Sequence, residues 1–188
     1  MPQRFDPSQP LSPEARRAMQ QLLPPGMAPP QLFAAYARNE GLFSFLVDKG
    51  VIGPTGLLDR RAMPRELREC VILRTCVATR NDYEFNLHVQ TISDRMGLAP
   101  EQIDDVRRPH ADAALWTPQQ LAAMRLVDGL VALDVPDALW SECRDALGEE
   151  MLVEIAQLAG MYFGVAMLVA LLRPAFDSYR FAEPVLAH

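Results

Sequence analysis

The sequence predicts an all-α fold. From Gln31 onward, apolar residues recur at spacings of three and four, which is the period of an amphipathic helix. β-Branched residues are scattered, and the apolar-polar alternation of a strand never persists. Breaker residues such as Gly53-Pro54, Gly97 and Pro136 separate the periodic segments. The body of the chain is therefore expected to consist of helices.

The first thirty residues differ from the rest because they contain half of the sixteen prolines. They leave room for one short helix, from Pro13 to Leu23, with Ser12 as its N-cap and Pro24-Pro25 as its stop. We interpret residues 1–30 as a proline-rich arm that packs on something else. The remaining helices are expected at 31–38, 41–49, 65–79, 82–96, 100–107, 117–132, 136–146 and 149–172.

With 188 residues the chain is long enough for one domain, which we place at 31–175, followed by a C-terminal tail at 176–188. The net charge of −6 is spread along the sequence and no basic cluster appears, so nucleic acid is not an expected partner. The start, "MPQRFDPSQPLSP", lacks the apolar core of a signal peptide, and a cytoplasmic location is expected. Three cysteines without a C-x-x-C pair indicate reduced core thiols.

The segment from Ile155 to Leu172 has no charged residue and is nearly long enough to cross a bilayer. Gln157 and Tyr162 interrupt its apolar surface and no basic cluster flanks it, so no membrane span is expected. Such a helix is typical of a core or of a subunit interface. The pair Gly160/Gly164 would let a neighbouring helix approach closely.

Glu69 is the acidic exception inside the apolar part of "RELRECVILRTCVAT". At about 100° per residue it projects between Ile72 and Cys76, into an apolar region. Desolvation there raises the pKa of a carboxyl group and makes it a candidate acid or base. The alternative is an ion pair with Arg65 or Arg80 near the helix surface.

Glu84 and His88 are four residues apart on the next predicted helix, at the margin of its apolar face, with Arg95 on the same strip. A carboxylate beside an imidazole fixes its tautomer and raises its pKa, as proton transfer requires. Alternatively, Asn81 and Glu84 form a capping box in which Glu84 reaches back to the Asn81 amide. His88 would then be an ordinary surface or interior histidine. Glu-x-x-x-His supplies only two metal ligands and His110 is no obvious third, so no metal site is expected.

The stretch "RELRECVILRTCVATRNDYEFNLHVQTISDRMGLAPEQIDDV" resembles the signature region of the carboxymuconolactone decarboxylase and AhpD-like alkylhydroperoxidase superfamily. The later "LAAMRLVDGLVA" and "LVEIAQLAGMYFGVAMLVALL" are similar to the following family helices, so the resemblance spans roughly Leu57 to Leu172. The hydroperoxidase branch has C-x-x-C followed by three residues and a histidine. Here its cysteine positions hold Asn81 and Glu84, which places the chain with the cysteine-less, decarboxylase-like branch.

The resemblance implies an AhpD-like helical domain that oligomerises through its helices, with a trimer or hexamer favoured. It also implies a cofactor-independent acid-base enzyme, not a thiol peroxidase, acting on a small carboxylated, lactone-like or enolisable molecule. The family positions make His88 the proton donor, with Glu69 and Glu84 as its catalytic partners. The candidate substrate-binding residues are Arg80, Tyr83, Arg95 and Tyr162.

One departure concerns the last helix, where many relatives have an Asn after the Tyr and this chain has Tyr162-Phe163. This change implies a more apolar pocket. The rival interpretation is a non-catalytic helical oligomer that binds a small ligand or a partner protein. Catalysis predicts a pocket where Glu69, Glu84 and His88 converge, whereas the rival predicts Glu84 turned to its own backbone and His88 in solvent.

Overall fold

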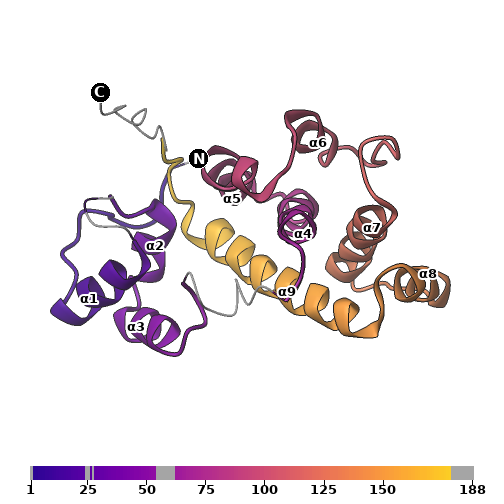
Figure 1. Ribbon diagram of the computed structural model, residues 1–188. Helices are drawn as coiled ribbons and strands as arrows, with labels where there is room; N and C mark the ends of the chain where they lie inside the picture. Colours follow the sequence, from indigo (N-terminus) through magenta and orange to yellow (C-terminus); the bar gives the residue numbers. More distant parts are fainter. Residues whose placement is uncertain (1, 24–25, 27, 54–61, 179–188) are drawn as a thin grey trace, which may run out of the picture.

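The computed structural model describes residues 2–23, 26, 28–53 and 62–178. These residues form α-helices and one 3₁₀-helix and no strand, so the all-α class is confirmed for them (Figure 1). The elements are α1 (Pro13–Leu22), α2 (Gln31–Tyr36), α3 (Glu40–Asp48), α4 (Arg65–Ala78), α5 (Asp82–Thr91), η2 (Asp94–Met96), α6 (Pro100–Asp105), α7 (Pro118–Ala132), α8 (Asp137–Leu147) and α9 (Glu149–Leu172). Predicted ends lie within two residues of these, except that the helix expected at 82–96 is broken.

The main core surrounds α4, which packs against α7, α9 and α5. Residues 70–73 of α4 are completely buried, in agreement with a helix that is apolar on most sides. The three cysteines are buried and free, as expected of core thiols. Burial raises the pKa of Cys70 to about 12, so this thiol stays protonated and unreactive at neutral pH.

A second, smaller core joins α1 to α3. Ala15 and Met19 of α1 are buried together with Phe43 and Val47 of α3. Ser12 caps α1 as predicted, since its hydroxyl accepts a hydrogen bond from the Ala15 amide at 3.1 Å. The predicted arm therefore packs on the next helices of the same chain, and the boundary drawn at residue 30 runs through this packed unit. The proposed Pro24-Pro25 stop and residues 179–188 of the predicted tail lie outside the described residues.

The N-terminal unit is attached to the rest of the fold through the start of α2. Pro30 at its N-cap has no side chain that can cap the helix. Instead, the Gln31 amide donates to Asp177 Oδ2 at 2.9 Å, and the Leu32 amide donates to the Tyr83 hydroxyl at 3.0 Å. The Tyr83 hydroxyl in turn donates to Asp177 Oδ2 at 2.5 Å. These contacts fix α2 against α5 and the segment that follows α9.

The long helix α9 buries one face against α4 and α7 and leaves apolar side chains on the other. By length and composition it could cross a membrane, as some core helices of soluble proteins could, and 28% of its apolar window is buried. A Cβ added at Gly160 or Gly164 would meet no atom within 4 Å. The large exposed apolar residues of α9 are Val153, Phe163, Met167 and Leu171.

Candidate functional site

A tight turn between α4 and α5 places the predicted site residues opposite one another. After α4, Arg80 adopts a positive φ of 56°, and the Asn81 amide donates back to the Cys76 carbonyl at 2.8 Å. The Asn81 side chain then caps α5 by accepting from the Glu84 amide at 3.2 Å. The chain reverses within a few residues, so α5 lies directly against α4.

Only half of the predicted capping box is present. Asn81 is the N-cap, but its own amide is bonded to Cys76, and the Glu84 side chain does not return to it. The Glu84 carboxylate points instead toward the imidazole, with Oε1 3.6 Å from His88 Nε2. The cap and the side-chain position of Glu84 are thus two separate features of the same helix end.

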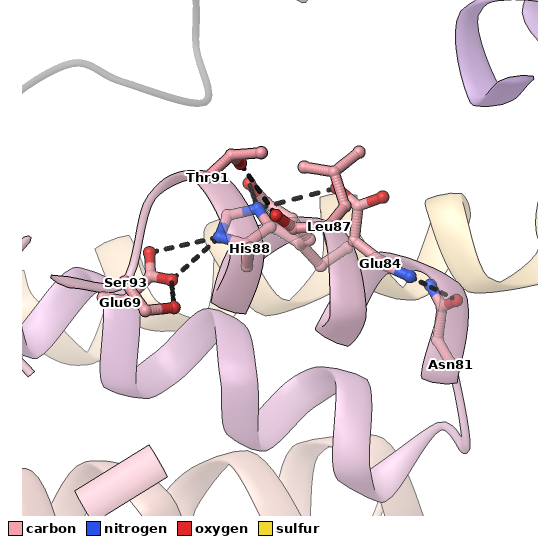
Figure 2. Close-up of polar contacts among 8 residues, drawn as sticks. Glu69, Asn81, Glu84, Leu87, His88, Thr91 and Ser93 are labelled. Atoms are coloured by element: carbon pink, nitrogen blue, oxygen red, sulfur yellow. Dashed lines mark hydrogen bonds and ion pairs between the residues drawn. The ribbon is translucent and has the colours of Figure 1, made fainter. Parts of the chain in front are cut away.

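His88 forms the centre of the site and is 2% exposed. Its Nδ1 lies 2.9 Å from Glu69 Oε1 and 3.2 Å from Oε2 (Figure 2). Glu69 is completely buried and also accepts a hydrogen bond from the Ser93 hydroxyl at 2.7 Å. The partners of Glu69 are therefore His88 and Ser93, and not Arg65 or Arg80, the ion-pair alternatives.

Ser93 reaches Glu69 because α5 ends earlier than its apolar period predicts. The Ile92 and Ser93 amides both donate to the His88 carbonyl, at 2.7 and 2.9 Å, and the chain resumes as η2 at Asp94. This break turns the Ser93 hydroxyl toward α4. No glycine or proline marks the break in the sequence, so pattern analysis missed Ser93.

On the opposite edge of the ring, His88 Nε2 lies 3.2 Å from the Tyr162 hydroxyl of α9. The two rings meet edge to face, with centroids 5.5 Å apart. Because Nδ1 faces a carboxylate, we assign a proton to Nδ1 in both charge states of the imidazole. The second nitrogen, Nε2, is then the one that exchanges a proton near Tyr162 and Glu84.

The electrostatics of the site favour a charged imidazole. Burial by itself lowers the pKa of His88, but the charges of Glu69 and Glu84 and their hydrogen bonds outweigh burial and raise it to about 9. Burial would raise the pKa of Glu69, yet the charge of His88 and the bonds from His88 and Ser93 lower it overall. Burial and the charge of Glu84 raise the pKa of Tyr162 well above its usual value. At neutral pH the site therefore holds an imidazolium, the Glu69 carboxylate and a neutral phenol.

We expect His88 to titrate near pH 9 in the ligand-free protein, as measured from its ring signals by NMR. This pKa lies above the ordinary value of 6.5, so protonation of His88 stabilises the folded state. That stabilisation is complete below about pH 6.5 and is lost as the pH rises through 9. Melting temperatures should accordingly fall between pH 7 and 10, and less so in His88→Gln. Titration at or below pH 6.5 would contradict this assignment.

A cavity of about 360 Å³ adjoins the imidazole. Of the residues proposed from the sequence, His88, Glu84, Arg95 and Tyr162 line this cavity, and Glu69 stands behind His88. Arg80 is exposed at the turn, and Tyr83 is buried against α2 and Asp177, so the structure does not bring these two to the cavity. Within the described part of the chain, no group of three or more His, Cys, Asp or Glu residues is arranged to hold a metal ion.

Sequence reasoning also missed two polar residues of the cavity wall, Arg68 and Tyr36. Arg68 lies on the narrow polar edge of α4. Because charged residues are common on helix surfaces, its sequence position did not indicate a binding site. Tyr36 belongs to α2, which no motif connects with the site. The placement of His88 away from solvent, with Glu84 turned to its ring, differs from the geometry that the non-catalytic interpretation predicts.

Comparison with known families supports the resemblance over part of the chain. Residues 54–129 match the family model described as "Carboxymuconolactone decarboxylase family". The match contains Glu69, Glu84, His88 and Ser93 and ends inside α7, so α9 with Tyr162 lies beyond it, and residues 54–61 lie outside the described structure. No curated protein and no solved structure matches the chain. Residues 54–129 are therefore similar to the carboxymuconolactone decarboxylase family.

Proposed function

We propose that the site is a cofactor-independent acid-base centre acting on a small carboxylated, lactone-like or enolisable molecule, as a decarboxylase or a related lyase or isomerase. The observation that carries the proposal is the position of His88. One nitrogen of its ring is held by a buried carboxylate at 2.9 Å, and the residue lines a cavity. A raised pKa keeps this group protonated at neutral pH, as a proton donor requires.

In a decarboxylation the bond between carbon and the carboxylate breaks, CO₂ leaves, and the electron pair remains on carbon as a carbanion or enolate. His88 donates its Nε2 proton to that carbon and becomes neutral, and solvent restores the proton afterwards. Glu69 orients the ring and stabilises the imidazolium before the transfer. The Tyr162 hydroxyl, 3.2 Å from Nε2, is placed to donate to a developing enolate oxygen. In an isomerisation the Glu84 carboxylate would remove a proton from one carbon while His88 donates its Nε2 proton to another, and transfer of the proton from Glu84 to Nε2 would then restore both groups.

Two arginines give the cavity its positive charge. Arg68 of α4 and Arg95 of η2 both line it, together with His88. A guanidinium binds a carboxylate in two parallel hydrogen bonds, so either side chain suits a carboxylated substrate. Arg95 was expected in this role from the sequence, and Arg68 now joins it in place of Arg80.

The proposal excludes thiol-dependent peroxide reduction. Asn81 and Glu84 occupy the positions of the redox cysteines of the hydroperoxidase branch. The thiol of Cys76 on α4 is buried, and burial and neighbouring carboxylates raise its pKa well above the usual value. A thiol that does not ionise is a poor nucleophile toward a peroxide.

The proposed chemistry is tested by incubating the protein in D₂O with β-keto acids, unsaturated lactone carboxylates and β,γ-unsaturated acids. CO₂ release and deuterium entry at carbon, followed by NMR, report decarboxylation and isomerisation on any of these compounds, whichever molecule is the natural substrate. Activity is expected in the wild-type protein and not in His88→Gln. Equal deuterium entry with wild-type protein, His88→Gln and buffer alone would count against the acid-base assignment.

We also propose that the chain forms a homo-oligomer, trimeric or hexameric by the family resemblance, through the exposed face of α9. Phe163 and Gly160 border a groove of about 260 Å³ whose other wall contains Leu130 and Leu133 of the α7 end. A second copy of the chain that packs on this groove and on the exposed side chains of α9 would remove their apolar surface from water, which favours association.

Light scattering at micromolar concentration should therefore give a mass of several chains, and Phe163→Glu should reduce it to that of one chain of 21.0 kDa. Leu42→Glu, the same type of change on exposed α3, is the control and should leave the mass unchanged. A stable wild-type monomer would contradict the proposal, and solubility only in detergent or with vesicles would point to a bilayer as the cover for α9.

A further inference from the structure

The cavity beside His88 has one wall that lies outside the family match. Leu22, Leu32, Phe33, Tyr36, Ile52 and Gly53 line it, and all of them precede residue 54. Figure 1 shows α1, α2 and α3 grouped beside the C-terminal half of α9, while α7 and α8 lie toward its other end. Part of the site is therefore built by a unit that is additional to the matched domain.

The two walls differ in chemistry. The ionisable side chains that face the cavity, apart from Tyr36, come from α4, α5, η2 and α9. The wall formed by α1, α2 and residues 52–53, which follow α3, offers mainly leucine, isoleucine and phenylalanine side chains. A ligand that fills the cavity thus meets charged groups on one wall, among the apolar side chains of Leu87, Ile92, Met96 and Val165, and mainly apolar side chains on the other wall.

Glu84 shows what the polar end of the ligand must provide. The residue is 6% exposed and lines the cavity, and its Oε2 is a buried oxygen without a hydrogen-bond partner among the described residues. Its other oxygen faces His88 Nε2 at 3.6 Å. A buried acceptor left unpaired is unfavourable, and a donor on a bound molecule would satisfy it.

We propose that α1, α2 and residues 52–53 act as a specificity wall, selecting a molecule whose bulky apolar body packs on Leu32 and Phe33 while a hydroxyl at its polar end donates to Glu84 Oε2. The inference rests on the proposed function, because it assigns the substrate class of that same site. The ligand is then a hydroxylated or enolic compound with an alkyl or aryl body, larger and more apolar than a simple lactone carboxylate.

Binding of three probes without a carboxylate to the unmodified full chain tests the donor and the apolar body separately from turnover. The probes are 4-butylphenol, its methyl ether 4-butylanisole, which has no donor, and phenol, which has no butyl group. Calorimetry should show 4-butylphenol binding roughly tenfold or more tightly than either of the others. Its advantage over 4-butylanisole comes from the hydrogen bond to a charged group, and its advantage over phenol comes from the buried methylene groups. Equal affinities for 4-butylphenol and 4-butylanisole would overturn the role of Glu84.

Two phenylalanines of the N-terminal unit provide a matched pair of variants for the wall. Phe33→Asn should remove most of the tenfold advantage of 4-butylphenol over phenol, whereas Phe45→Asn should preserve it, because Phe45 is 55% exposed and does not line the cavity. If Phe33→Asn does not fold, NMR can detect the contact instead, as a nuclear Overhauser effect between the butyl protons of the probe and the ring protons of Phe33 in the chain without this substitution. Equal loss in both variants, or no such transfer, would overturn the proposal.

Failure of this inference is distinguishable from failure of the proposed function. Selective probe binding by a protein that shows no proton transfer on any acid would retain the wall and reject the chemistry. Turnover of carboxylated compounds without discrimination among the three probes would retain the chemistry and reject the wall.

Discussion

Replacing His88 by glutamine should reduce kcat/KM by about 10²- to 10⁴-fold, the usual contribution of a general acid or base. Glutamine has a similar length and keeps hydrogen-bonding capacity toward Glu69, but it cannot hold and release a proton at Nε2. Both ring nitrogens of His88 make contacts, at 2.9 Å to Glu69 and 3.2 Å to Tyr162. A water molecule therefore cannot replace the imidazole unless these two side chains move. Wild-type rates in a folded His88→Gln protein would reject the mechanism.

The same substitution should also affect stability, which the sequence alone did not predict. His88 and Glu69 are a buried ion pair, and removing one partner of such a pair typically costs about 3–5 kcal/mol because the other charge is left uncompensated. The double variant Glu69→Gln/His88→Gln should recover stability without recovering activity. His110→Gln, at a histidine outside the cavity, is the control and should change neither. Chemical denaturation and circular dichroism separate the two effects.

The sequence was sufficient for the parts of the site that depend on helical period. Glu69 projects from an apolar helix and Glu84 and His88 share one face of the next, and in the structure all three converge, because a capped turn brings the two helices together. The direction in which Glu84 points was left open by the sequence. It was decided by backbone hydrogen bonding, since the Asn81 amide is already bonded to Cys76.

The parts that the sequence did not reveal depend on contacts between segments that are far apart. Ser93 reaches Glu69 through a helix break that carries no proline or glycine, and Tyr36 reaches the cavity because α2 is fixed by Tyr83 and Asp177. Tyr83 was named as a substrate-binding candidate with the family resemblance. One residue along a helix turns a side chain by about 100°, and the Tyr83 side chain accordingly lies in the packing against α2. The spacing of residues shows which side chains share one face of a helix, but it does not show which other element of the fold packs against that face.

Glu69→Gln should move the alkaline limit of activity from about pH 9 downward, to the ordinary value of 6.5 or below. Glu69 supplies the largest of the effects that raise the pKa of His88, so without it burial lowers that pKa while only Glu84 still raises it. A fall to the ordinary value of 6.5 would reduce the protonated fraction at pH 8 by about 30-fold, with a matching loss in kcat/KM. Below about pH 5.5 the variant and wild-type rates should converge, since His88 is protonated in both.

The measurement is kcat/KM against pH, together with the NMR titration of the His88 ring in the same variant. The two pKa values should move together, because a positioning residue acts on catalysis through the proton affinity of the imidazole. Glu66→Gln is the matched control: it is the same change on the same helix, at an exposed position outside the cavity, and should leave both profiles unchanged. An alkaline limit that stays at about pH 9 in Glu69→Gln would show that His88 is not the titrating acid, because its pKa depends on the Glu69 carboxylate 2.9 Å away.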